Sequence, residues 1–170
     1  MRRLFAADYG VAEYRAHIGR LLGLYEPLER AFAGAGGRAD AFDIHARTQA
    51  LRADLRAMGA TAKQAGQLER HRPFTALTTL ESLGYAYVLF GSMLGAKLIT
   101  ARLRRVLGDA ASYHFYAADQ PEADRMWQSY CDRLQRDGGA NVALVCAAAM
   151  EMFDVYAAWL SPASEIGVAS

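Results

Sequence analysis

The stretch GYAYVLFGSMLGAKLITARLRR, residues 84–105, has the pattern of a helix but carries three glycines. Each glycine inside a helix costs about 1 kcal/mol relative to alanine. Gly84, Gly91 and Gly95 lie seven and four residues apart, so they share one face of the helix. Without a β-carbon, that face admits a flat or bulky group to the backbone and lets the helix bend. The pattern is also typical of a close crossing by a second helix, so both interpretations stand.

Length and composition indicate one soluble, cytoplasmic domain covering residues 1–170. The chain is 53% hydrophobic with 4 prolines, which argues against a disordered protein. With 19 basic and 18 acidic residues, the net charge of +1 favours neither nucleic acid nor an anionic membrane surface as partner. The uncharged run 83–96 is shorter than the roughly 18 residues of a membrane span. Cys131 and Cys146 show no metal or disulfide spacing and are predicted to be buried thiols.

Apolar residues recur at intervals of three and four along most of the chain, which predicts helices. Thr78 and Glu81 suit a capping box for a long helix that runs to Leu107 and stops at Gly108. The other predicted helices cover residues 11–32, 44–58, 121–134 and 141–161. In the last of these, the residues expected to point inward are Val145, Ala149, Met152, Phe153 and Tyr156. No segment alternates with a period of two, so we expect an all-α, single-domain helical bundle.

The segment YVLFGSMLGA, residues 87–96, resembles the distal-helix signature Y-V-L-E-G-S-x-L-G-G of bacterial biliverdin-producing heme oxygenases, especially those found alongside bacteriophytochromes. Residues 12–29 resemble the family's second helix, with its leucines and terminal Y-x-P-L-E. Residues 113–127 and 147–160 resemble its aromatic turn and its closing helix. The resemblance therefore spans nearly the whole chain, with the segments in the same order.

This resemblance implies a heme-oxygenase-like bundle in which a long kinked distal helix lies over the heme. In that family heme is both substrate and cofactor, and its ring is opened at a meso carbon to give biliverdin, carbon monoxide and ferrous iron. A reductase or ferredoxin supplies the electrons, and the cofactor carries the chemistry, so no catalytic acid, base or nucleophile is expected. Gly91, Ser92, Gly95 and Ala96 are expected to contact heme. Tyr87 could add a hydroxyl to a distal water network, and Arg102 could bind a propionate.

The sequence departs from the family pattern in three ways. The family's iron ligand is a histidine in a first helix, in a T-x-x-x-H-x-x-x-E pattern, but here the match to the second helix begins almost at Met1. We therefore expect that helix to be missing and apolar surface of the heme slot to be exposed. Phe90 stands where the family has Glu, and Ala96 stands where it has a second Gly. Three accounts remain open: a start codon further upstream, a loss of heme chemistry, or another residue ligating iron.

The four histidines do not provide an obvious replacement ligand, and no metal site is predicted. His17 is expected on the polar side of its helix, and His45 in solvent. His71 is expected in a loop with ordinary hydrogen bonds, and His114 as a partly buried structural residue among aromatics. None pairs with Cys, Asp or Glu at a metal-ligand spacing.

Three hypotheses about function follow. The first is a heme-cleaving enzyme of the heme oxygenase class. The second is a non-catalytic relative whose open slot binds another hydrophobic ligand or a partner helix. The third is an interaction module that self-associates through the exposed apolar slot.

Overall fold

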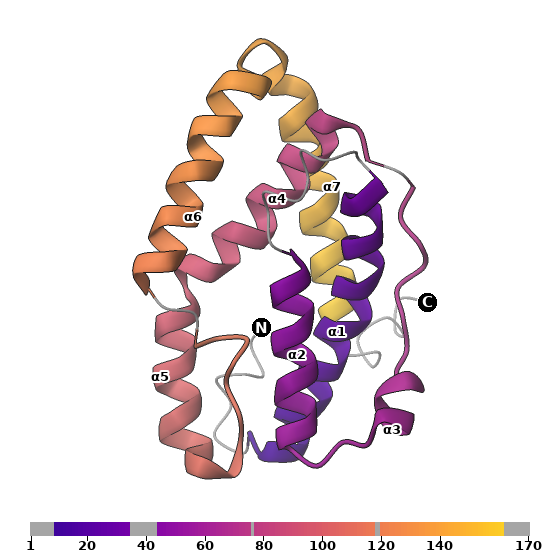
Figure 1. Ribbon diagram of the computed structural model, residues 1–170, viewed down its shortest axis with the longest axis vertical. Helices are drawn as coiled ribbons and strands as arrows, with labels where there is room; N and C mark the ends of the chain where they lie inside the picture. The colour runs from indigo at the N-terminus through magenta and orange to yellow at the C-terminus, as the bar shows by residue number, and fades with distance from the viewer. Residues whose placement is uncertain (1–8, 35–43, 76, 118–119, 162–170) are drawn as a thin grey trace, which may run out of the picture.

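The computed structural model describes residues 9–34, 44–75, 77–117 and 120–161, and all regular secondary structure in those ranges is helical, with no strand (Figure 1). The helices are α1 (Val11–Gly34), α2 (Ile44–Ala57), α3 (Ala62–Gly66), α4 (Thr79–Leu94), α5 (Ala96–Leu107), α6 (Gln120–Arg133) and α7 (Val142–Leu160). The predicted all-α class is confirmed. Short 3-10 and π-helical turns close the hairpin between α6 and α7.

The bundle is built on two helix pairs, α1 with α2 and α4 with α7 (Figure 1). α1 contributes a stripe of side chains with 0–1% exposure, at intervals of three and four residues. This stripe consists of Tyr14, Ile18, Leu21, Leu22, Tyr25 and Leu28. Burial of such a continuous stripe is the main contribution to helix stability in a protein. The predicted helix 11–32 is therefore confirmed, with two more residues at its C-terminal end.

A buried carboxylate ties the aromatic turn after α5 to α2. Asp54 is 0% exposed and accepts hydrogen bonds from the Ser112 hydroxyl at 2.6 Å and from the backbone nitrogens of His114 and Phe115 at 2.7 and 2.9 Å. Such charge-assisted bonds satisfy a buried carboxylate that would otherwise be very costly. The Asp54 carboxylate thus holds the turn in place across nearly 60 residues of sequence.

The central helix begins at the predicted capping box and breaks at the third glycine. The Thr78 hydroxyl accepts from the Glu81 backbone nitrogen at 3.2 Å, and the Glu81 carboxylate accepts from the Thr78 nitrogen at 2.7 Å. α4 ends at Leu94 and α5 begins at Ala96, with a bend of 47° between them. The Ser92 hydroxyl donates to the Leu89 carbonyl at 2.6 Å, a bond that competes with the helical ladder. Gly108, with φ of 55°, ends α5 as predicted.

Gly84 lies where a second helix crosses α4 closely. At this position the structure therefore supports helix crossing, and not ligand contact, as the reason for the glycine. A β-carbon there would lie 2.5 Å from the Val145 carbonyl oxygen and 2.6 Å from the Ala148 β-carbon. Only glycine allows α4 and α7 to approach this closely, because no real β-carbon tolerates such contacts. α7 is therefore pressed onto the first half of α4.

The structure contains one short helix for which no helix was predicted. α3 follows Gly59, and Thr61 and Gln64 begin it with a capping box.

The prediction of two buried cysteines is corrected by the structure. Cys146 is exposed, and Cys131 is only half-buried.

Candidate functional site

A groove of about 670 Å³ runs between α4, α6 and α7, in the size range of small-molecule sites. Its lining is mostly apolar and includes four aromatic rings. The lining residues are Tyr87, Val88, Gly91, Ser92, Leu94, Trp127, Phe153, Tyr156, Ala157, Leu160 and Ser161. No charged side chain belongs to this described lining.

Gly91 opens the backbone of α4 to this groove. A β-carbon at Gly91 would meet nothing within 4 Å. Gly84, two helical turns earlier on the same face, is by contrast crowded by α7. Tyr87 flanks it, 42% exposed, with ring centroids 6.0 Å from Trp127 and 6.3 Å from Phe153. These rings and the bare backbone form a wall that suits a flat apolar ligand.

Phe153 was predicted to point into the core, and that prediction is wrong. Its side chain is 52% exposed and lies in the groove, whereas Met152 next to it is fully buried. Apolar character alone does not distinguish a core phenylalanine from one in a binding groove. Trp127 and Phe153 are therefore site residues that sequence reasoning placed only as members of helical stripes.

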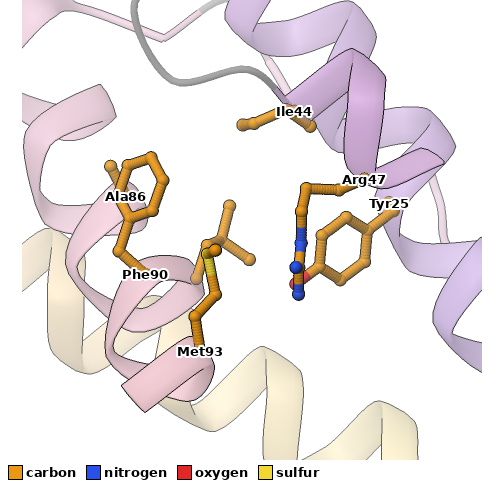
Figure 2. Close-up of a pocket in the computed structure, with 7 residues that line it drawn as sticks. Tyr25, Ile44, Arg47, Ala86, Phe90 and Met93 are labelled. Atoms are coloured by element: carbon orange, nitrogen blue, oxygen red, sulfur yellow. The ribbon is translucent and has the colours of Figure 1, made fainter. Parts of the chain in front are cut away.

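The opposite face of α4 is closed by core packing. Figure 2 shows Phe90 and Met93 of α4 on one side of a small pocket, with Arg47 and Tyr25 on the other. The void between them has a volume of about 10 Å³. That volume holds about one water molecule and no larger ligand. Phe90 is 5% exposed, so the residue that stands in place of the family's glutamate packs in the core, away from the groove.

The six residues predicted to contact a ligand separate at the kink. Tyr87, Gly91 and Ser92 line the groove. The other three lie at or beyond the bend and are not in the lining: Gly95, Ala96 and Arg102. Ala96 is only 4% exposed, whereas Leu98 in the same turn of α5 is 77% exposed. Ligand contact by these three stays a prediction.

The polar side chains in the groove lining belong to Tyr87, Ser92, Trp127, Tyr156 and Ser161. Burial raises the pKa of Tyr156 well above its ordinary value, so its hydroxyl keeps its proton. The Ser161 carbonyl accepts a hydrogen bond from the Arg20 guanidinium at 2.9 Å, which brings a cation to the groove's end. Nothing in the local sequence around Arg20 signals this position, since 141 residues separate the two partners.

The structure corrects two of the histidine predictions. His17 was expected on the polar side of α1, but its Nε2 is hydrogen-bonded to the Tyr116 hydroxyl at 2.8 Å and its ring stacks on Tyr116. His114 was expected to be partly buried, but its side chain is exposed, and only its backbone is held by Asp54. The turn geometry places its neighbours Phe115 and Tyr116 inward instead.

The other two histidines agree with expectation. His45 is exposed and pairs with Glu29, and His71 lies in a loop, bonded to the Arg72 carbonyl at 2.8 Å. No histidine lines the groove, and no cluster of three or more His, Cys, Asp or Glu forms a metal site among the described residues.

The half-buried His17 predicts a specific acid sensitivity. Desolvation lowers its pKa from 6.5 to about 4, so on acidification the unfolded chain takes up the proton first. The stability contributed by the neutral imidazole is present above about pH 6.5 and is lost as the pH falls toward 4, by about 3 kcal/mol. We expect His17→Phe to flatten this part of the stability profile, measured by urea unfolding across that range. His114→Phe, at an exposed side chain with no hydrogen-bond partner among the described residues, is the matched control for loss of a histidine.

Comparison with known families closes the description of the site. The family model described as heme oxygenase matches residues 1–162, which is nearly the whole chain. Neither the search of curated proteins nor that of solved structures produced a match.

Proposed function

This chain belongs to the heme oxygenase family, and from that premise we propose that it binds heme in the groove beside Gly91 and opens it oxidatively to biliverdin, carbon monoxide and iron. The proposal rests mainly on one observation, the uncovered backbone at Gly91 in an aromatic groove of about 670 Å³. The bacterial biliverdin-producing subtype belongs to the same proposal. It rests on the segment YVLFGSMLGA.

The groove suits the porphyrin ring better than the iron. Its rings and the bare turn of α4 offer the flat apolar contact that a macrocycle needs. No imidazole or thiolate occurs in the described lining, and burial holds the pKa of one of its two tyrosines, Tyr156, well above its ordinary value. Iron in this class of protein needs an axial donor, and in the family pattern that donor is a histidine, so the described lining accounts for ring binding but does not supply histidine ligation.

The chain's own residues have three roles in this proposal. Gly91 lets the ring lie against the backbone, and Tyr87, Trp127 and Phe153 cover its edges and exclude water. The Ser92 hydroxyl donates a hydrogen bond to the Leu89 carbonyl. Its oxygen can therefore accept a hydrogen bond from a ligand in the groove. Arg20, at the end beside Ser161, and Arg102 on α5 are the candidates for pairing with propionates. Bound heme would supply the redox chemistry.

A hemin titration of the 170-residue chain tests the proposal. We expect saturable but weak binding with a broad Soret band, because ring contacts act without a histidine donor from the groove. Reduction with ascorbate in air should then yield biliverdin, identified by its absorbance and mass, above the yield of hemin with an unrelated helical protein. A sharp Soret band at one-to-one stoichiometry would instead show that a histidine of this chain ligates iron.

The second candidate function is non-catalytic binding of another hydrophobic ligand in the same groove. The absence of histidine and cysteine from the described lining favours it. Saturable binding of hemin and of iron-free protoporphyrin with equal affinity, without biliverdin formation, would support this candidate over the enzyme.

The binding partners and the cellular location of this chain are predicted from its family membership and its sequence. An active enzyme requires an electron donor such as a reductase or ferredoxin. We expect no nucleic-acid or membrane partner and a cytoplasmic location. The apolar surface of the open groove predicts self-association of the chain. One helical stretch in the described chain, 124–160, is long and apolar enough to cross a membrane by composition, which is weak support for a membrane location because core helices meet the same criteria.

A further inference from the structure

A second pocket, of about 420 Å³, lies between α1, α2 and α3. Figure 1 shows α3 on the other side of α1 and α2 from α5 and α6, so this pocket is separate from the groove. Its floor is aliphatic, and Leu22 and Leu55 in it are 1% and 2% exposed. The complete lining is Leu22, Glu26, Arg52, Leu55, Arg56, Ala60, Thr61, Ala62, Ala65, Gly66 and Arg70.

The charges of this pocket do not balance. Three arginines and one glutamate give a net charge of +2. Burial alone would raise the pKa of Glu26, but hydrogen bonds from Arg52 and Arg70 outweigh it and hold the pKa below its ordinary value. Glu26 is therefore ionised near neutral pH, and it neutralises only one of the three cations.

The hydrogen bonds show which cations remain available. Every nitrogen of the Arg70 guanidinium already has a hydrogen-bond partner in the protein. Its Nε donates to Glu26, and its two terminal nitrogens donate to the carbonyls of Leu68 and Ala65. Arg52 donates to Glu26 through Nε at 3.2 Å and Nη2 at 2.7 Å, so its Nη1 remains available to donate to a ligand. The Arg56 side chain, exposed one helical turn later, makes no hydrogen bond or ion pair with another described residue, and only its backbone carbonyl accepts, from the Gly59 nitrogen. Two like charges so placed on one helix face repel each other.

We infer that this pocket binds a small organic anion, with a carboxylate or phosphate head at Arg52 and Arg56 and a short apolar body on the aliphatic floor. The planar guanidinium matches such oxyanions in shape and charge. An anion between the two arginines removes their repulsion. Accessible apolar contact above the buried Leu22 and Leu55 is provided by Ala60, Ala62 and Ala65. The pocket's volume lies within the range of small-molecule sites. This site does not depend on heme binding in the groove.

The test uses hexanoate as probe with the full 170-residue chain, at constant ionic strength. Binding is followed by amide chemical shifts in α3, at Ala62 and Ala65, which line the pocket. We expect saturable shifts with hexanoate, and a loss of at least about fivefold in affinity in Arg56→Gln, because the cation that pairs with the head is removed. Arg105→Gln, an exposed arginine of α5 outside the pocket, is the matched control and should bind hexanoate normally.

Two further probes separate the head from the body. Hexanol has the body without the charge, and inorganic phosphate has the charge without the body, so both should bind more weakly than hexanoate. Equal binding of either probe, unchanged binding in Arg56→Gln, or no shifts at all would overturn the inference. Gly91→Leu should leave hexanoate binding intact, so a failure of this site and a failure of the heme proposal are distinguishable.

Discussion

Replacing Gly91 by leucine is expected to reduce hemin binding at least tenfold, while the far-ultraviolet circular dichroism of the protein stays unchanged. The leucine side chain would occupy the open space beside α4 where the ring is proposed to lie. A tenfold loss corresponds to about 1.4 kcal/mol of binding free energy, which displacement of a ring from its contact surface easily exceeds. Helicity should not suffer, because leucine is a better helix former than glycine.

Ala101→Leu is the control for this experiment, since Ala101 is exposed on α5 and outside the groove. It adds a leucine to the same bent pair of helices without changing the groove wall. Hemin binding that is equally strong in Gly91→Leu, Ala101→Leu and the original chain would exclude the Gly91 face as the heme site. Equal losses in both variants would point to a general effect of added apolar surface instead.

Replacing Gly84 by alanine is expected to destabilise the protein by about 1–3 kcal/mol, the usual cost of overpacking a core. The new β-carbon would lie 2.5 Å from the Val145 carbonyl oxygen and 2.8 Å from the Ala149 backbone nitrogen. Backbone atoms in a packed helix cannot rotate away as a flexible side chain does, so α7 must shift as a whole. Urea unfolding measures the change as a lower midpoint with a similar slope.

The same substitution at Gly91 provides a matched comparison within one helix. Gly91→Ala adds a β-carbon in open space and removes the conformational freedom of glycine, so it should stabilise the chain by up to about 1 kcal/mol. Opposite signs for the two alanine variants would establish that the two glycines have different roles. A loss of stability at both positions would mean that α7 covers Gly91 in solution and that the groove is closed.

The sequence predicted the part of the candidate site that lies on α4, but not the residues that α6 and α7 contribute to it. The motif around Gly91 and Ser92 identified the part of α4 that lines the groove. The motif's last residue, Ala96, falls beyond the kink and is 4% exposed, because a bend changes which residues share a face. Phe153 and Trp127 complete the groove from α7 and α6, and helical periodicity alone gave no reason to set them apart from core residues.

The amino-acid sequence by itself determined the helices, the capping box at Thr78, the stop at Gly108 and the tendency of the central helix to bend, because each depends on residues within a turn or two of one another. Only the tertiary structure decided that Gly84 is covered by α7 while Gly91 faces an open groove. It also decided that His17 is half-buried against Tyr116, 99 residues away. Bare glycines and apolar side chains are compatible with either a helix neighbour or a ligand, and the choice is made by whichever distant segment packs beside them.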